Sequence, residues 1–464
     1  MGFVEALRKN VGRTGAAFAA RDAVNQAMIR HWCDAMEDHN PIYTDPAFAE
    51  RSLHRAIVAP PAMLNAWTMQ GLVPRRPADP RHPDPASATY AALDAAGYTS
   101  VVATNSEHEY PRYLKLGDAL RAVATVKEVS DEKQTGLGTG HFVTTETEFR
   151  DQTDAVVGRM LFRILKFKPG TGRSSAPDPG EGTASATPRP RRPTPGISRD
   201  TRFFWDGLAA GELRIQKCEG CGALHHPPVV RCPGCGAYEF GWQVASGRGR
   251  VYSHVEPVHP RFPAFDPGYV VGLVELEEGT RLVTNIVDID PERVAIGLPV
   301  ELVVRKQNSE QPLPLFRPMR PARNETTLRF GDVQVGASLD ACPIPITATL
   351  IVATAIASRD YQDVHHDREL AVQRGSPDIF MNILTTSGLT ARYVTDWAGP
   401  EAVLRRLAIR LGAPNYPHDT MTMEGSVTSL RPSGRGGIVE VAIRGYNRLG
   451  NHVTGSVELE LPAA

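Results

Sequence analysis

The sequence predicts a mixed α+β protein in which two related halves flank a small cysteine-containing β module. Three observations predict this organisation. Residues 1–168 and 326–464 each place a polar turn before an apolar helical stretch, and each ends in three long strand-like segments. Two Cys-x2-Cys pairs lie between these halves. Residues 169–196, rich in Pro, Gly, Ser and Thr, separate the first half from the cysteines and predict a disordered linker.

Length and composition narrow the class of protein. A chain of 464 residues is too long for one ordinary core, and 41% hydrophobic and 22% charged residues are typical of globular proteins. The net charge of −1 gives no general electrostatic reason to bind nucleic acid. The apolar runs are too short to span a bilayer, and the N-terminus lacks a signal-peptide core. We therefore expect a cytoplasmic protein that binds neither nucleic acid nor membranes.

The two halves resemble diverged copies of one pattern. The polar turns are "EDHNPIYTD" at 37–45 and "RDYQDVHHD" at 359–367, and the helical stretches that follow are 60–72 and 380–394. The predicted strands are 118–129, 138–150 and 154–168 in the first half and 420–430, 437–446 and 452–461 in the second. We expect each half to wrap a long antiparallel sheet around one central helix. In the second helix, Gly388 is expected to let the helix approach the sheet closely.

The sequence also predicts the local structure of three further segments. The apolar run 346–357 has the character of a strand that leads into the second polar turn. Residues 307–325 predict an extended segment lying on a surface. The Pro-rich insertion 73–88 either makes room for a bulky group beside the first helix or forms a plain surface loop, and the sequence does not separate these alternatives.

The cysteine pattern predicts a structural metal site. The ligand pattern is Cys218-x2-Cys221-x10-Cys232-x2-Cys235. Two such knuckles, each with a glycine-containing turn, suit tetrahedral Zn2+; iron in the same geometry and an ancestral site without metal are the alternatives. With four thiolates present, His225 and His226 are expected to be bystanders. Protein fills all four positions, so we expect the metal to hold structure and to do no chemistry.

Short strand-like segments follow the cysteines. They predict about five strands, and a small Greek-key barrel of the OB type is the expected fold. The strands carry Glu and Val, without an aromatic ladder or a basic groove, which disfavours nucleic-acid binding through this barrel.

A resemblance to a known family covers most of residues 200–306. The order "FFWDGLAAGELRIQKCEGCGALHHPPVVRCPGC", "SGRGRVYSHV" and "YVVGLVELEEGTRLVTNIV" resembles the acyl-CoA-associated zinc-ribbon/OB-fold family, whose members accompany thiolase-like proteins. The resemblance implies that this block docks a partner and handles acyl-CoA. It also implies that Phe203, Phe204 and Trp205 lie on an N-terminal helix that packs onto the barrel.

The second polar turn resembles a catalytic motif. Its Asp360-x4-His365 pair, set between an apolar run and an apolar helix, resembles the MaoC-like, or R-specific, enoyl-CoA hydratases. Their motif is roughly Gly-Asp-x-Asn-Pro-x-His; Arg359, Gln362 and Asp363 replace its Gly, Asn and Pro. The resemblance implies hot-dog folds, here a double hot dog, with Asp360 and His365 as the catalytic pair. The alternative is that the two residues only form a hydrogen-bonded turn.

Hydration of an α,β-unsaturated thioester explains these residue types. A carboxylate and an imidazole that touch one water can share the removal of its proton and the protonation of the substrate's α-carbon. The developing enolate needs hydrogen-bond donors, which a helix N-terminus supplies. By similarity to the family's His-Gly-Met-Leu element, "MNIL" assigns the backbone donor to Asn382. The neighbours His366 and Asp367 are expected to form a solvated helix start.

The first polar turn lacks the imidazole. It keeps Asp38, Asn40 and Pro41, but Tyr43 stands where the histidine belongs. A phenol has a pKa of about 10 and is a poor base at neutral pH. We therefore expect the first half to be catalytically inactive, to shape the acyl or CoA pocket, and to complete the double hot dog.

The whole order resembles the steroid side-chain hydratases of the actinobacterial type, in which the two hot-dog halves are usually separate subunits. The resemblance implies hydration of a side-chain enoyl-CoA derived from cholesterol. It also implies that residues 197–318 dock a thiolase-like aldolase that cleaves the hydrated product, and we expect a homo-oligomer, a dimer. A non-catalytic acyl-CoA-binding scaffold and a nucleic-acid-binding protein are the alternative functions.

Overall fold

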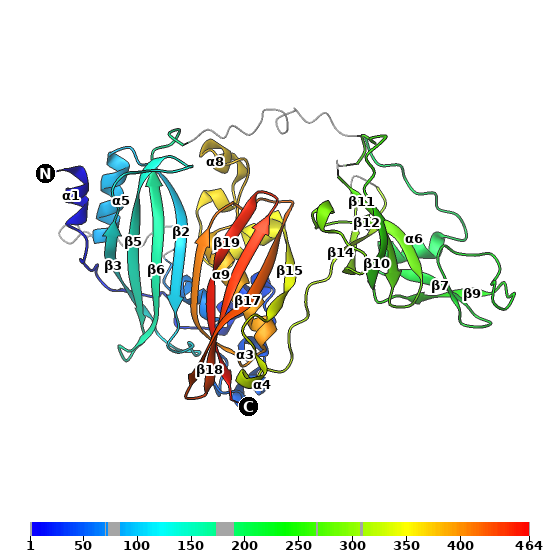
Figure 1. Ribbon diagram of the computed structural model, residues 1–464, viewed down its shortest axis with the longest axis horizontal. Coiled ribbons are helices and arrows are strands. Elements are labelled where there is room, and N and C mark those ends of the chain that lie inside the picture. The colour runs from blue at the N-terminus through cyan, green and yellow to red at the C-terminus, as the bar shows by residue number, and fades with distance from the viewer. Residues whose placement is uncertain are drawn as a thin grey trace. The chain divides into compact units, whose positions relative to one another are not determined.

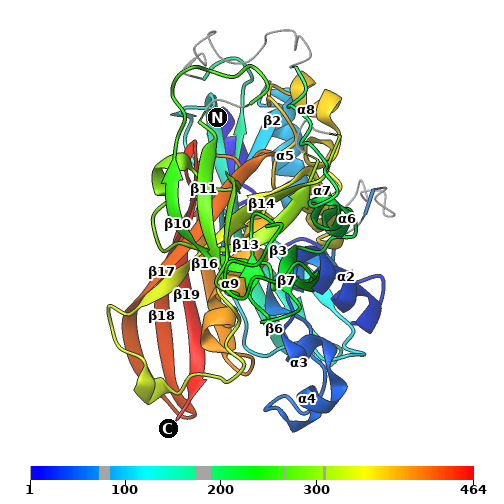
Figure 2. The same ribbon diagram turned by 90° about the vertical axis from the view of Figure 1, so that its right-hand side faces the viewer.

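The computed structural model describes residues 2–69, 71–72, 84–172, 190–265, 268–306 and 310–463. The chain forms two compact units (Figures 1 and 2). The first unit contains residues 1–175 and 321–464, and the second contains residues 176–320. The first unit thus combines the two halves that the sequence relates to each other.

The first unit is built on one continuous sheet, in the order β1-β3-β5-β6-β2-β16-β19-β18-β17-β15, with β4 paired to β5 (Figure 1). The strands of the first half are β1 (Phe18–Ala19), β2 (Ser100–Glu109), β3 (Arg121–Val129), β4 (Lys133–Gln134), β5 (Thr139–Arg150) and β6 (Val156–Phe167). Those of the second half are β15 (Ser338–Ile346), β16 (Val403–Leu411), β17 (Asp419–Ser433), β18 (Gly436–Asn447) and β19 (Gly450–Pro462). The predicted strand segments are confirmed.

The two halves share one strand order. The two halves meet at a seam where β2 pairs with β16. Outward from there, the strand order is β2-β6-β5-β3-β1 in the first half and β16-β19-β18-β17-β15 in the second. With β4 left aside, both halves therefore run from their second strand through the fifth, fourth and third to the first. The seam is antiparallel and pairs Asn105–Glu109 with Arg406–Arg410. The expected repeat and the double hot-dog fold are confirmed by this symmetry.

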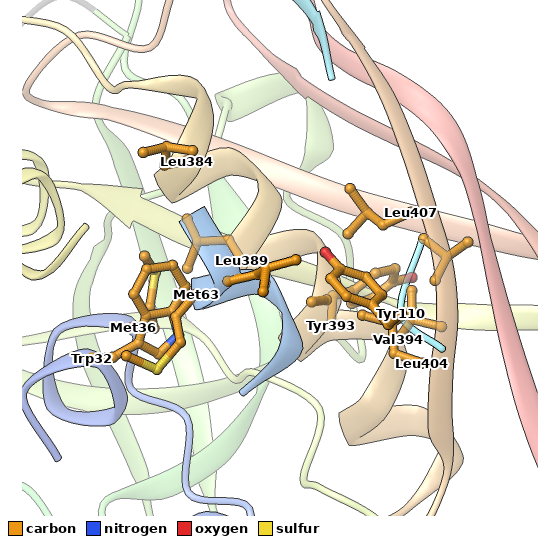
Figure 3. Close-up of a cluster of buried hydrophobic side chains, with 14 of the residues drawn as sticks. Trp32, Met36, Met63, Tyr110, Leu384, Leu389, Tyr393, Val394, Leu404 and Leu407 are labelled. Carbon is orange, nitrogen blue, oxygen red and sulfur yellow. The ribbon is translucent and has the colours of Figure 1, made fainter. Parts of the chain in front are cut away.

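The helices cover one face of this sheet. The first half has α1 (Phe3–Arg8), α2 (Gln26–Met36), α3 (Pro41–Thr44), α4 (Pro46–Arg51), the 3-10 helix η1 (Pro61–Trp67) and α5 (Pro85–Ala95). The second half has η3 (Phe330–Asp332), α7 (Ala348–Ala357), η4 (Asp363–His365), α8 (Arg368–Gln373) and α9 (Ile383–Ala398). Helix α9 is the central helix, because every residue from Ile383 to Thr395 is buried. Its apolar side chains join both halves into one core (Figure 3).

The central helix packs against the first half as well as against its own sheet. A Cβ added at Gly388 would lie 2.8 Å from the Met36 sulfur and 3.0 Å from a ring carbon of Trp32. Both residues belong to α2. The prediction that Gly388 admits the sheet is therefore wrong: this glycine lets α9 approach a helix of the other half.

Two predicted elements differ from the structure. The run 346–357 is not a strand beyond Ile346, because Ala348–Ala357 forms α7, with the Thr347 side chain accepting a hydrogen bond from the Leu350 N–H at 2.9 Å. An apolar run of this length does not distinguish a strand from a buried helix. The helical stretch 60–72 forms only the 3-10 helix η1, and Gly71 then takes a φ of +86°, which no helix continues through.

The Pro-rich insertion lies largely outside the described residues. Residues 73–83 are not described, and Asp84 caps helix α5, which starts at Pro85. The C-terminal part of the predicted insertion is therefore helical. Helix α5 packs through Leu93 into a small separate core with Leu7, Val126 and other residues of the first half.

The second unit contains a three-stranded sheet and a closed barrel. Helix α6 (Arg202–Ala209) precedes β7 (Arg214–Cys218), β8 (Leu224–His225) and β9 (Phe240–Val244), which form the sheet β8-β7-β9. The barrel β10-β11-β12-β14-β13 consists of β10 (Arg248–Val255), β11 (Val270–Leu276), β12 (Arg281–Ile286), β13 (Pro299–Arg305) and β14 (Leu313–Pro318), with the 3-10 helix η2 (Pro291–Arg293) before β13. Phe204 of α6 is buried in the barrel core, as expected.

The segment 307–325 does not simply lie on a surface. Residues 313–318 form β14, which pairs with β13 along six residues and closes the barrel. The sequence did not predict this strand, because prolines stand at 312, 314 and 318 and proline is depleted from strand interiors. Within the described part of the chain, no helix is both long and apolar enough to cross a bilayer.

Candidate active site and metal centre

A tight turn at the end of α7 positions Asp360. Arg359 adopts the left-handed conformation, with a φ of +59°, and the Asp360 N–H then donates to the Ala355 carbonyl at 2.9 Å. This conformation is strained for a residue with a Cβ, whereas glycine adopts it freely. The turn directs the Asp360 side chain inward, and the residue is 8% exposed.

His365 ends the short helix η4 and is held in one orientation. Its Nδ1 lies 2.7 Å from the Phe380 carbonyl oxygen, and its ring packs edge-on against the Phe380 ring. Because a carbonyl only accepts hydrogen bonds, Nδ1 carries the proton. In the neutral imidazole, Nε2 is therefore an acceptor, and it faces the Asp360 carboxylate.

The structure brings the two predicted catalytic side chains together. His365 Nε2 lies 3.5 Å from Asp360 Oδ2, which is longer than the 2.7–2.9 Å of a strong charge-assisted hydrogen bond. Two acceptors at this separation need a proton or a hydrogen-bond donor between them. A water molecule donates one O–H to each, so the geometry suits a water held by both groups.

Asn382 caps the central helix beside this pair. Its Oδ1 accepts a hydrogen bond from the Thr385 N–H at 2.7 Å, and its Nδ2 donates to Asp360 Oδ2 at 3.0 Å and to Ser358 Oγ at 3.1 Å. Its own backbone N–H forms no hydrogen bond with another described residue. Sequence reasoning assigned only this N–H to the site. It missed the Asn382 side chain and Ser358, which immediately precedes the Arg-Asp pair in the sequence.

The neighbours of the pair have structural contacts. His366 is exposed, and Asp367 caps helix α8 by accepting a hydrogen bond from the Leu370 N–H at 3.0 Å. These contacts are those of the helix start that the sequence predicts.

The first half contains a corresponding turn without a histidine. Asp38 is buried, and its Oδ1 lies 2.8 Å from Arg323 Nη2. The same guanidinium also forms an ion pair with Asp396, so Arg323 lies between two carboxylates. Burial raises the pKa of Asp396 to about 6, against the opposing effect of Arg323. Burial also raises the pKa of the Tyr43 phenol well above its ordinary value, so this phenol is no base at neutral pH. Arg323 was not identified from the sequence, because nothing local marks it.

The four predicted cysteines converge in the second unit. The sulfurs of Cys218, Cys221, Cys232 and Cys235 all lie within 4.8 Å of one another. The Sγ–Sγ distances of 3.5 Å for Cys218–Cys235 and 3.6 Å for Cys221–Cys232 approach the value of about 3.8 Å that Zn–S bonds of about 2.3 Å give in a tetrahedron. The donor set therefore fits a tetrahedral metal ion and forms a metal site.

The adjacent histidines lie outside the sulfur cluster. His225 Nε2 lies 3.5 Å from Cys232 Sγ, as a hydrogen-bonding neighbour of that sulfur. His226 packs against the Phe204 ring, and burial lowers the pKa of His226 to about 4. Both positions agree with the prediction that these histidines are bystanders.

Three family models match the chain. The model described as "FAS1-like, dehydratase domain region" matches residues 12–160. The model "ChsH2, rubredoxin-like zinc ribbon domain" matches residues 205–240, and "ChsH2, C-terminal OB-fold domain" matches residues 242–305. The matched ranges correspond to the first hot-dog half, the cysteine-containing sheet and the barrel.

Curated relatives match the chain in two parts. The probable enoyl-CoA hydratase alpha subunit of Thermomonospora curvata is 42% identical over 316 residues, which cover 68% of this chain and 96% of the relative. The 3-oxo-4,17-pregnadiene-20-carboxyl-CoA hydratase of Mycobacterium tuberculosis matches through both subunits. Its alpha subunit is 44% identical over 61% of this chain and 86% of the subunit. Its beta subunit is 51% identical over 27% of this chain and 95% of the subunit.

A solved structure shares the fold. A MaoC-like dehydratase aligns with a TM-score of 0.53 and 16% identity, covering 98% of this chain and 99% of that chain. At this identity the likeness concerns the fold alone. The 42% identity to the Thermomonospora relative, together with the three family models, shows that this chain belongs to the MaoC-like enoyl-CoA hydratases, with the zinc-ribbon and OB-fold domains of the alpha subunits.

Proposed function

We propose that the chain hydrates the side-chain enoyl-CoA of a cholesterol-derived steroid, with Asp360 and His365 as the catalytic pair. The 3.5 Å separation of two acceptor atoms, Asp360 Oδ2 and His365 Nε2, carries this proposal, because it suits one shared water. The steroid substrate is supported by identities of 44% and 51% to the two subunits of the mycobacterial pregnadiene-carboxyl-CoA hydratase.

The proposed reaction adds one water across the conjugated double bond. The water held by the pair forms a bond from its oxygen to the β-carbon and gives one proton to the pair. The pair then delivers a proton to the α-carbon, so that no net proton is consumed. The enolate that develops on the thioester oxygen is stabilised by N–H groups at the start of α9, among them that of Asn382.

The fused chain replaces two subunits in this proposal. The alpha-subunit domains occupy residues 205–305, and the beta-subunit match of 127 residues is close to the length of the second half, residues 326–464. We therefore infer that the second half of this chain, which carries Asp360 and His365, corresponds to the beta subunit. The first half then has no catalytic role, since Tyr43 replaces the histidine and Arg323 neutralises Asp38.

The catalytic proposal is tested with a steroid side-chain enoyl-CoA and with crotonyl-CoA as the short-chain comparison. We expect kcat/KM to be higher for the steroid substrate, and His365→Ala to lower kcat by about 100- to 10,000-fold. His366→Ala, a change at the exposed neighbouring histidine, is the matched control and retains the rate. Equal rates for wild type and His365→Ala refute the hydratase assignment and leave the acyl-CoA-binding scaffold as the function.

The metal in the cysteine cluster is proposed to be structural Zn2+. Four thiolates exclude an open coordination position, so the ion stabilises the β8-β7-β9 sheet and supplies no catalysis. Metal analysis of the purified chain is expected to find one zinc per chain, and fewer in a Cys232→Ser variant. Iron at this stoichiometry would contradict the assignment.

We also propose that residues 197–318 dock a thiolase-like aldolase that cleaves the hydrated product. The resemblance to the zinc-ribbon/OB-fold family supports this, as does an exposed apolar strip on β9. Trp242 and Val244, two residues apart on this edge strand, are 53% and 51% exposed. Large exposed apolar side chains on a strand edge are typical of interaction sites.

The docking proposal is tested by co-purifying the full-length chain with the aldolase. Trp242→Glu is expected to reduce the retained aldolase. Leu449→Glu, which changes a similarly exposed apolar residue of the other unit, is expected to retain it. Equal retention by both variants would show that β9 is not the docking surface.

A further inference from the structure

The Asn382 side chain differs from the other helix caps in what its amide nitrogen contacts. The asparagine caps Asn25 and Asn40 donate through Nδ2 to backbone carbonyls. Asn382 also caps its helix through Oδ1, but its Nδ2 reaches Asp360 Oδ2 at 3.0 Å. This carboxylate oxygen is the one that faces His365 Nε2. The amide therefore contacts the same carboxylate oxygen that faces the imidazole of the proposed catalytic pair.

The surrounding hydrogen bonds fix the orientation of this amide. The Ser358 hydroxyl donates to the Ala355 carbonyl at 3.1 Å, so its oxygen accepts the hydrogen bond from Asn382 Nδ2. At the other end, the Thr385 N–H requires an acceptor, which is Asn382 Oδ1. If the amide were flipped, its oxygen would face the Asp360 carboxylate and its NH2 group would face the Thr385 N–H, and neither contact is a hydrogen bond. One orientation of Asn382 therefore satisfies all its partners.

These contacts are buried. Ser358 is fully buried, and Asn382 is 3% exposed. Bulk solvent therefore does not compete with these hydrogen bonds in the folded chain. Among the residues that the structure describes, Asp360 Oδ1 accepts only a long hydrogen bond of 3.4 Å from the Gln362 N–H. The strongest constraint on the rotation of the Asp360 carboxylate is consequently Asn382.

We propose that Asn382 is a positioning residue for hydration: its side-chain amide holds the Asp360 carboxylate at the separation from His365 that accommodates the nucleophilic water. This inference rests on the proposed hydratase function and extends it. It assigns to the Asn382 side chain a role separate from that of its backbone N–H. One residue then links the central helix, the carboxylate and the enolate-binding end of the site.

Asn382→Ser separates positioning from helix capping. Serine caps helices about as well as asparagine, but its side chain is too short to reach Asp360. We expect kcat for the steroid enoyl-CoA to fall about 10- to 100-fold, with KM within about twofold of wild type. The thermal midpoint is expected to stay near that of wild type. Asn382→Asp, which also caps but places a second carboxylate against Asp360, is expected to lose more activity than Asn382→Ser.

Matched variants complete the test. Asn25 caps α2 in the same way, through the Met28 N–H at 3.0 Å, and Asn25→Ser is expected to leave kcat unchanged. Ser358→Ala, which removes one partner of the amide, is expected to lower kcat less than Asn382→Ser and provides the readout if Asn382→Ser does not fold. Wild-type kcat in Asn382→Ser or in Ser358→Ala overturns the inference while the hydratase function stands. Absence of hydration by the wild type overturns the proposed function itself.

Discussion

The two polar turns of the hot-dog unit have nearly the same backbone but different chemistry. Glu37 and Arg359 both adopt the left-handed conformation, with φ of +52° and +59°. The aspartate that follows each of them donates its N–H to a carbonyl five residues back, at 2.8 Å for Asp38 and 2.9 Å for Asp360. The local turn is thus conserved within the chain, and what surrounds the carboxylate differs.

The surroundings decide which carboxylate is available for the proposed hydration. Asp360 Oδ2 lies beside a neutral amide and an imidazole. Asp38 instead forms an ion pair with Arg323 inside the first unit. A guanidinium bound to a carboxylate competes with any water for its lone pairs. The two turns therefore share their backbone geometry and differ in the partners of their carboxylates.

The largest expected effect comes from exchanging the residues that distinguish the turns. His365→Tyr should lower kcat at least as much as the loss of a general base, about 100- to 10,000-fold, because a phenol cannot accept the water's proton at neutral pH. Tyr43→Phe should leave kcat unchanged. The reciprocal change Tyr43→His, made in the His365→Tyr chain, should restore no hydration, because the Asp38 carboxylate still forms its ion pair with Arg323. Recovery of activity in that double variant would show that Asp38 is available after all.

Removal of Arg323 tests the other side of the comparison. Arg323→Met leaves Asp38 and Asp396 without their shared cation, and we expect the free energy of unfolding to fall by about 3 kcal/mol. The exposed pair Arg431–Glu458 gives the control, since Arg431→Met should cost at most about 1 kcal/mol. Urea unfolding of both variants measures the difference, and equal losses would mean that Arg323 acts as an ordinary surface arginine.

The first site should also make stability depend on pH. Asp396 has a pKa of about 6 in the folded chain, raised by burial, and about 3.9 when unfolded. The folded state therefore binds more protons between these values, so its stability should decrease by about 2 kcal/mol as the pH rises from 4 to 6. Arg323 and Arg392 oppose this shift, and Asp38 adds to it.

Asp396→Asn should flatten this pH dependence and raise stability at pH 8. The exposed Asp131→Asn should leave it unchanged. Urea unfolding at several pH values between 4 and 8 measures the slope. An unchanged slope in Asp396→Asn would assign the pH dependence to another group.

The smallest expected effect concerns the shared strain of the turns. Replacing Arg359 by glycine removes the steric cost of a left-handed conformation and should raise the free energy of unfolding by about 1 kcal/mol. Ala210, the C-cap of α6 with a φ of −89°, is the matched position without this strain. Ala210→Gly should give no gain in a thermal unfolding measurement. A gain there equal to that at Arg359 would mean that strain is not the cause.

Sequence patterns predicted those parts of the molecule that local chemistry determines. Long strands with polar ends and the cysteine spacing at 218–235 were read correctly, because strand residues and metal ligands follow short-range rules. The run 346–357 was read as a strand because apolar content alone does not distinguish a strand from a buried helix. Asp360 and His365 were placed together because only four residues separate them.

The rest of the site depends on tertiary contacts. Asn382 lies 22 residues after Asp360 in the sequence, and Arg323 lies 285 residues after Asp38, so their contacts have no local signature. The role of Gly388 was also misassigned for this reason. Its partner is α2, which precedes it by about 350 residues. Such pairings follow from how the two halves pack, which no single segment encodes.

The pairing of β2 with β16 has a consequence for how this molecule tolerates dilution. If these two strands belonged to separate chains, the halves would have to meet by diffusion, and the paired fraction would fall on dilution. Here both strands belong to one polypeptide, so the local concentration of one half around the other stays constant at any protein level. Equal amounts of the two halves are also guaranteed by translation of a single message.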